Sequence, residues 1–204
     1  MAVKHGRLYL TDDISIDTKE QLKDISLETW LKIYNFRRGL YLKPALAMLK
    51  ASKKVEEYLW LPATNLLCSL VDLDGKIFLN AGEPKNLHPD DYKKFASNQL
   101  NIDQELSTGG SNSIFSKDIF YQTVRCGAVH SLVIADNYKP GRGTKVIVWN
   151  ESTQVLSYDS SKELWKFNPW NLGTACENFD FSGAEKCHLE KFFSRDWENI
   201  LDSL

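Results

Sequence analysis

The chain has 204 residues, of which 43% are hydrophobic and 12% aromatic, so it is long enough to bury the core of one ordinary domain without disulfides or metals. Its formal net charge at pH 7 is -2, which excludes a positive field over the whole protein as a means of attracting nucleic acid. Any contact with nucleic acid must therefore come from a local group of basic side chains.

The cysteines do not form a recognisable metal-binding pattern. There are four of them, Cys68, Cys126, Cys176 and Cys187, and no two are spaced as C-x-x-C. Cys187 is followed directly by His188, and we expect two adjacent residues of a helix to be poorly placed for binding one metal ion. We therefore predict four free thiols in a reducing compartment, with no metal and no cofactor.

The apolar segments have the character of a cytoplasmic protein. The most apolar run, LWLPATNLLCSLV at residues 59–71, contains a proline and is too short to cross a bilayer. The first ten residues lack the long apolar segment of a signal peptide. We expect no membrane association and a cytoplasmic location.

The first part of the chain has mainly helical patterning. Residues 1–17 alternate apolar and polar side chains over a few positions, which predicts a short strand or arm. Over residues 18–61, apolar side chains recur at intervals of three and four, as on the buried face of a helix. We expect Gly39 and Pro44 to divide this stretch into two or three helices.

Helical patterning continues after the first proline of the apolar run. A long helix is predicted over residues 62–81, because its proline suits a first turn and leucines recur along one face. A shorter helix is predicted within residues 88–100. Residues 101–116 are polar and rich in glycine and serine, which predicts a loop. Ser116 is expected to cap a further helix over residues 117–135.

The patterning changes beyond that helix. Two runs rich in β-branched and aromatic residues, KVIVW and QVLSY, flank the turn-like sequence NEST, which predicts a hairpin at about residues 144–159. The aromatic-rich residues 165–173 are expected to form a packed loop or a partner surface. A C-terminal helix is predicted from about residue 182. The predicted fold is mainly α, a helical bundle with a small β-hairpin inserted before the C-terminal helix. We expect residues 1–55 to form an N-terminal arm and helical extension, and residues 56–204 to form the main domain.

One predicted helix carries two groups suited to chemistry on phosphate. The stretch FYQTVRCGAVHSLV, residues 120–133, contains Arg125 and His130, with Gly127 between them. Five residues correspond to about 140° of rotation on an α-helix, so one flat face does not hold both side chains. They could converge at the edge of a cleft, or in a symmetric dimer that pairs two copies of the helix. Gly127 costs about 1 kcal/mol relative to alanine, which indicates close approach of a backbone or a ligand.

The sequence VRCGAVHS resembles the R-x-x-x-x-H motif of HEPN domains, which lies on the last long helix of a small helical bundle. The predicted helix over residues 62–81 looks like the core helix that precedes this motif, and the hairpin is similar to one found in some branches of the family. The resemblance covers roughly residues 55–200, and its specific part is the motif. It implies a HEPN-like fold for residues 56–204.

Many HEPN proteins are metal-independent ribonucleases that act as dimers in toxin–antitoxin, phage-defence and RNA-processing systems. The resemblance therefore implies RNA as the substrate, a homodimer, and an antitoxin or defence partner protein. It also implies that Arg125 and His130 are the catalytic residues at the dimer cleft. Histidine can exchange protons near neutral pH, and arginine stays charged and offers a planar fork to phosphate oxygens. Such a reaction requires no metal ion.

Neighbours of the motif are candidates for contact with RNA. Tyr121 lies one turn before Arg125, where it can stack on a base or pack in the core. Lys139 and Arg142 belong to a basic loop, residues 138–145. This loop is well placed to touch phosphates if the cleft exists, and it also suits a plain entry to the hairpin.

Cys126 and Gly127 complete the candidate substrate contacts. Catalytic HEPN members commonly carry Asn, Asp or His directly after the arginine, and a thiol is a weaker hydrogen-bond partner. This departure leaves open a non-catalytic HEPN-like module that binds RNA, a nucleotide or a protein partner. A third interpretation is a helical bundle with no role on nucleic acid, in which the motif is accidental.

Overall fold

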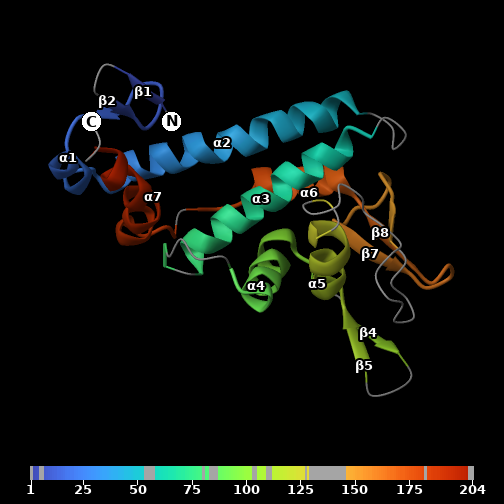
Figure 1. Ribbon diagram of the computed structural model, residues 1–204. Helices are drawn as coiled ribbons and strands as arrows, with labels where there is room; N and C mark the ends of the chain where they lie inside the picture. The colour runs from blue at the N-terminus through green and yellow to red at the C-terminus, as the bar shows by residue number, and fades with distance from the viewer. Residues whose placement is uncertain are drawn as a thin grey trace. The chain divides into compact units, whose positions relative to one another are not determined.

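The computed structural model describes a mainly helical chain, as the sequence predicted (Figure 1). The described residues are 2–4, 7–52, 58–79, 81–82, 87–102, 105–108, 112–126, 128, 146–181 and 183–201. No helix among these residues is both long and apolar enough to cross a membrane.

Contacts group the chain into two compact units, each built from segments that are separated in the sequence. Unit one comprises Met1–Leu40, Lys76–Asn86 and Asp180–Leu204, and unit two comprises Tyr41–Gly75 and Leu87–Phe179. The contiguous division between residues 55 and 56 stays a prediction, because residues 53–57 lie outside the described part.

Unit one contains a small sheet where the sequence predicted a strand or arm. Strands β1 (Ala2–Lys4), β2 (Arg7–Tyr9) and β3 (Ser15–Ile16) pair antiparallel in that order. The short helix α1 (Lys19–Lys23) follows the sheet. Helix α7 (Lys186–Leu201) is the predicted C-terminal helix.

Aromatic rings form the core of unit one. The fully buried ring of Trp30 stacks on Phe193 and on Trp197, with centroids 6.2 and 5.8 Å apart. Tyr34, also fully buried, meets the ring of Phe181 edge-on at 5.5 Å. Because each large ring removes much apolar surface from water, this stack stabilises the packing of α7 against the first turns of the helix that carries Trp30.

That helix, α2, runs from Leu27 to Ala51 without interruption, although we expected a division at Gly39 and Pro44. Proline lacks the backbone N–H and normally costs about 3 kcal/mol inside a helix. Packing beyond the proline offsets this cost: Leu49 is 4% exposed and lies against Gly173, and its carbonyl accepts a hydrogen bond of 2.8 Å from the Trp170 indole. Tertiary contact therefore outweighs the local signal.

The middle helices agree with the prediction. Helix α3 (Trp60–Phe78) and helix α4 (Pro89–Leu100) lie close to the expected ranges (Figure 1). The His88 side chain accepts a hydrogen bond from the backbone N–H of Asp90 at the start of α4. Residues 169–177 form helix α6 (Pro169–Glu177) rather than the expected loop, because Asn168 caps the helix and a proline occupies its first turn.

The polar stretch at residues 101–116 is not a plain loop. It contains the antiparallel strands β4 (Glu105–Thr108) and β5 (Asn112–Phe115). The polar composition concealed a two-strand ladder, because such a ladder requires only backbone hydrogen bonds between the strands. Ser116 does not cap the following helix α5 (Ser116–Ile119), because Phe115 occupies the cap position and the Ser116 hydroxyl donates to the Ile102 carbonyl at 3.0 Å.

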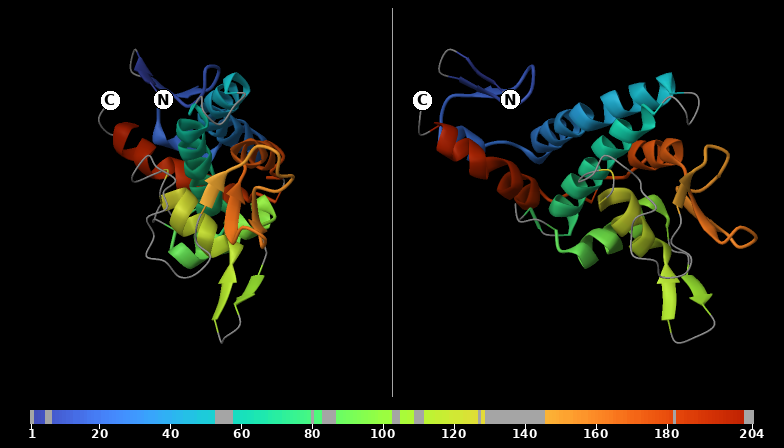
Figure 2. Two further views of the ribbon diagram at one scale, coloured as in Figure 1. Left: turned by 90° about the vertical axis from the view of Figure 1, so that its right-hand side faces the viewer. Right: turned by 45° about the vertical axis from the view of Figure 1, so that its right-hand side comes forward.

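The second sheet of unit two corrects the predicted hairpin at residues 144–159. Its order is β6-β8-β7, with β8 (Leu164–Phe167) between β6 (Val146–Val148) and β7 (Leu156–Asp159), drawn in orange in Figure 2. Strand β6 pairs parallel with β8, and β7 pairs antiparallel with β8. The side chains of Trp165 and Phe167 are fully buried, so the strand that the sequence did not predict takes the central place.

Candidate functional site

The structure describes three of the seven predicted site residues. Tyr121 and Arg125 lie on a π-helix, η2 (Phe120–Arg125), which continues α5, and Cys126 follows directly. The other four lie outside the described residues: Gly127, His130, Lys139 and Arg142. The expected α-helix over residues 117–135 is thus, where it is described, a short α-helical turn followed by π-helix.

The π-helical winding changes how residues five apart are arranged. The backbone N–H of Cys126 donates to the carbonyl of Tyr121, five residues earlier. Ala128 also has the π-helical conformation. Because a π-helix bonds each residue to the fifth along the chain, residues at this spacing lie in successive turns on one side. The described π-helix ends at Arg125, the first residue of the R-x-x-x-x-H motif, and His130 lies outside the described residues.

Two tyrosine rings hold the guanidinium of Arg125. Its central carbon lies 5.5 Å from the ring centroid of Tyr92 and 5.6 Å from that of Tyr121. The two rings contact each other, with centroids 5.4 Å apart and an interplanar angle of 59°. Both distances are within the range of cation–π attraction. We call these three residues the arginine cluster.

The arginine cluster joins two elements. Tyr92 comes from α4 and is 1% exposed, whereas Tyr121 and Arg125 come from η2 and are half-buried. The ring of Tyr92 is therefore fixed in the core, and the Arg125 side chain that lies against it is half-buried. Tyr92 was not predicted as a site residue, because it lies on a different helix from Arg125. The only signal in the sequence was the apolar face of α4, which predicted that this side of the helix is buried.

The charge of the cluster follows from its surroundings. Burial acts to lower the pKa of Arg125, but interactions with Tyr92, Cys126 and Tyr121 outweigh burial and raise this pKa above its ordinary value. Burial raises the pKa of the Tyr92 phenol well above 10 and that of the Cys68 thiol to about 12. At neutral pH the arginine is therefore a cation and these two neighbours are uncharged.

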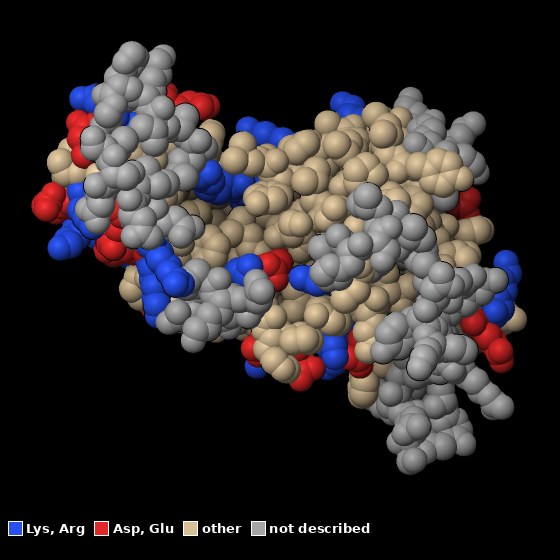
Figure 3. Space-filling view, in the orientation of Figure 1, with Lys and Arg blue, Asp and Glu red and all other residues tan. Residues whose placement is uncertain are grey.

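A second cation lies beside the cluster but is neutralised. The ammonium of Lys93 is 5.7 Å from the centroid of the Tyr121 ring, 2.8 Å from Asp118 and 3.3 Å from Asp90. The hydrogen bond with Asp118 is the main cause that raises the pKa of Lys93. Figure 3 shows positive and negative side chains next to one another around α4. Lys93 thus ties α4 to α5 and adds little net charge to the site.

The thiols behave as the sequence predicted, since all four cysteines are free. Cys68 and Cys176 are buried, Cys126 is half-buried next to Arg125, and Cys187 is exposed.

A second group of side chains was not predicted from the sequence. Glu185 lies close to Cys187 and His188, and the three ligand atoms are within 4.8 Å of one another.

Comparisons with protein-family models, with curated proteins and with solved structures found no match for this chain. The HEPN resemblance therefore rests on the motif quoted from the sequence.

Proposed function

We propose that this chain is a metal-independent ribonuclease of HEPN type that acts as a homodimer. In this proposal Arg125 holds a phosphate of the RNA and His130 transfers the proton. The observation that carries the proposal is the position of the Arg125 guanidinium against the rings of Tyr92 and Tyr121, at 5.5 and 5.6 Å. The R-x-x-x-x-H motif, from Arg125 to His130, supports it.

A guanidinium held in this way is suited to a phosphate oxygen. Arginine offers a planar set of N–H donors that can bind two phosphate oxygens at once. A free arginine side chain loses much rotational freedom when it binds a ligand, and contacts that fix it beforehand reduce that cost. The two tyrosine contacts of Arg125 have this effect, because they restrict the side chain before RNA arrives.

The proposed reaction uses the 2′-hydroxyl of the RNA as the nucleophile. His130 accepts the proton of this hydroxyl, the 2′-oxygen forms a bond to phosphorus, and the bond from phosphorus to the 5′-oxygen breaks. The 5′-oxygen then takes a proton from an imidazolium, which the second protomer's copy of the motif supplies. The products are a 2′,3′-cyclic phosphate and a 5′-hydroxyl. Arg125 stabilises the negative charge that gathers on the phosphate oxygens in the transition state.

A non-catalytic role in binding is the second candidate. Cys126, at the position where catalytic members commonly have Asn, Asp or His, is half-buried beside Arg125. A thiol forms weaker hydrogen bonds than those side chains, so the site suits an RNA-binding, nucleotide-binding or protein-binding module in which the phosphate is held and not cut. In a toxin or phage-defence setting, an antitoxin or defence partner protein would act on the catalytic form.

RNA cleavage in excess EDTA separates these candidates. The proposal expects the purified protein to cut RNA under these conditions and to leave cyclic-phosphate ends. His130→Ala should abolish cleavage with little change in the thermal melt. His88→Ala is the control for cleavage, which it should leave unchanged because its side chain is 69% exposed; loss of its hydrogen bond from the Asp90 N–H should lower the melting temperature slightly. RNA that is bound but left intact by the wild type favours the binding module. RNA that is neither bound nor cut contradicts the ribonuclease and an RNA-binding module.

A further inference from the structure

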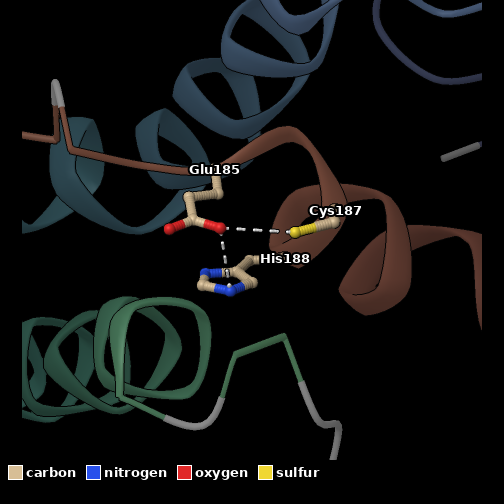
Figure 4. Close-up of side chains that lie close together, drawn as sticks. All are labelled: Glu185, Cys187 and His188. Atoms are coloured by element: carbon tan, nitrogen blue, oxygen red, sulfur yellow. Dashed lines mark hydrogen bonds and ion pairs between the residues drawn. The ribbon is translucent and has the colours of Figure 1, made fainter.

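The start of α7 brings together three side chains of different chemistry. Glu185 precedes the helix, and Cys187 and His188 lie in its first turn. In Figure 4 the thiol and the imidazole both point toward the carboxylate. The side chains are accessible, with Glu185 67% exposed and His188 23% exposed. From the sequence we expected the adjacent side chains of Cys187 and His188 to diverge. Glu185 lies three residues before His188, so these two side chains share one side of the turn, and the Cys187 thiol lies close to the same carboxylate.

We propose that Glu185, Cys187 and His188 bind a zinc ion. One carboxylate oxygen, Oε2 of Glu185, lies 3.5 Å from the Cys187 Sγ and 3.5 Å from the His188 Nε2. Zinc binds sulfur at about 2.3 Å and nitrogen or oxygen at about 2.0–2.2 Å in tetrahedral geometry, which places neighbouring ligand atoms about 3.4–3.6 Å apart. Two of the three separations already have this value, and all three are below 4.8 Å.

The donor set selects the class of metal. A thiolate and an imidazole favour zinc and similar borderline ions, whereas magnesium and calcium prefer an all-oxygen set. The thiol now donates a hydrogen bond to the carboxylate, and zinc would replace this proton, which leaves as the metal binds. The thiolate and the carboxylate then supply two negative charges that balance the dication. Three protein ligands leave a fourth position for water or another ligand.

The backbone around the group is held in place. The carbonyl of Glu185 accepts hydrogen bonds from the N–H groups of His188 and Leu189, at 3.1 and 3.2 Å. Gly82, with a φ of +76°, lies directly against the backbone of His188, where any side chain at position 82 would collide with the His188 carbonyl. The ligand-bearing turn is therefore fixed at both ends before a metal arrives, which favours binding by reducing the ordering cost.

This site is independent of the proposed ribonuclease. Its residues belong to unit one, whereas Arg125 belongs to unit two, and the proposed cleavage uses no metal. Removing zinc with EDTA should leave RNA cleavage unchanged, so failure of one proposal does not affect the other.

Cobalt substitution of the full-length, metal-free protein tests the proposal. Cobalt(II) has the geometry preferences of zinc and gives sulfur-to-metal charge-transfer absorption when a thiolate binds it. We expect this absorption to saturate at one cobalt per chain and to disappear when zinc is added. Cys187→Ser should abolish the absorption, and Glu185→Gln and His188→Gln should each weaken cobalt binding at least tenfold.

The matched control is Cys126→Ser, which removes a half-buried thiol of the other unit and should leave the cobalt spectrum unchanged. Circular dichroism of each variant establishes that it is folded. Cobalt absorption that persists in Cys187→Ser, or that disappears in Cys126→Ser, would overturn the assignment. The absence of charge-transfer absorption in the folded wild type would overturn it as well.

Discussion

Replacing Tyr121 with leucine removes one of the two rings that hold the Arg125 guanidinium. The two rings lie at nearly equal distances from the guanidinium, 5.6 Å for Tyr121 and 5.5 Å for Tyr92, so the change removes about half of the cation–π attraction. Leucine keeps an apolar side chain at this half-buried position. The buried ring of Tyr92 stays in place, so Arg125 is loosened rather than released.

The expected effect on RNA affinity follows from these contacts. A cation–π contact contributes about 0.5–1 kcal/mol when it is exposed and about 2 kcal/mol when it is desolvated. Arg125 is between these limits, so loss of one ring should cost about 0.5–1.5 kcal/mol of pre-organisation. At about 1.4 kcal/mol for each factor of ten, the dissociation constant should rise about 2- to 12-fold. Loss of the contact between the two rings should also lower the free energy of unfolding by about 0.5–1.5 kcal/mol.

Fluorescence anisotropy with a labelled single-stranded RNA measures this effect. All proteins carry His130→Ala, which prevents cleavage during the titration. Tyr121→Phe is the matched control, because it keeps the ring and removes only the hydroxyl, and its affinity should stay within twofold of the parent. Thermal melts establish that each variant is folded at the temperature of the titration.

Two results would refute the reasoning. If Tyr121→Leu binds RNA as tightly as the parent, the tyrosine contacts do not prepare Arg125 for a phosphate. If Tyr121→Phe loses as much affinity as Tyr121→Leu, the hydroxyl and not the ring is the important group.

Two further predictions concern stability. Asn168→Ala should lower the free energy of unfolding in urea by about 0.5–2 kcal/mol, because the Asn168 oxygen accepts from the N–H groups of Trp170 and Asn171 at 3.0 and 3.1 Å and caps α6; a loss below about 0.5 kcal/mol would contradict this role. Burial raises the pKa of Cys68 from 9.0 to about 12, so above pH 9 the unfolded chain binds fewer protons than the native protein and stability falls with rising pH. In Cys68→Ala the free energy of unfolding should fall less steeply between pH 9 and 10, by up to about 1.4 kcal/mol per pH unit. An unchanged dependence on pH would contradict the raised pKa of the Cys68 thiol.

The sequence was a good guide where local and tertiary signals agree. Helices α3 and α4 begin near a proline and present a face of apolar residues, such as the fully buried Leu67 and Leu70 of α3. It failed where tertiary packing decides. Pro44 suggested a break in α2, but contacts made farther along by Leu49 with α6 keep the helix continuous.

The second sheet illustrates a different limit. The sequence indicated two strands joined by a turn, and sequential strands usually pair. The structure instead places the unpredicted strand β8 between them, because Trp165 and Phe167 need the most buried position. Several strand orders would satisfy the local sequence preferences equally well. The burial of particular side chains determines which order forms.

The candidate site was partly predictable. Arg125 and Tyr121 could be predicted, because the R-x-x-x-x-H motif contains Arg125 and Tyr121 lies one turn before it in the same segment. Tyr92 comes from a different helix, and its contact with Arg125 depends on how α4 packs against η2. The π-helical winding was not foreseen either, because the periodicity of apolar residues over so few positions does not separate it from α-helix.

The salt dependence of RNA binding tests the central claim most directly, namely that Arg125 contacts a phosphate. The dissociation constant of a single-stranded RNA is measured at several salt concentrations for the His130→Ala protein with and without Arg125→Gln. The account predicts weaker binding by the Arg125→Gln protein and a slope of log affinity against log salt that is smaller by about 0.7, the value for one lost phosphate contact on a single strand. Equal affinities and equal slopes in two folded proteins would contradict the account.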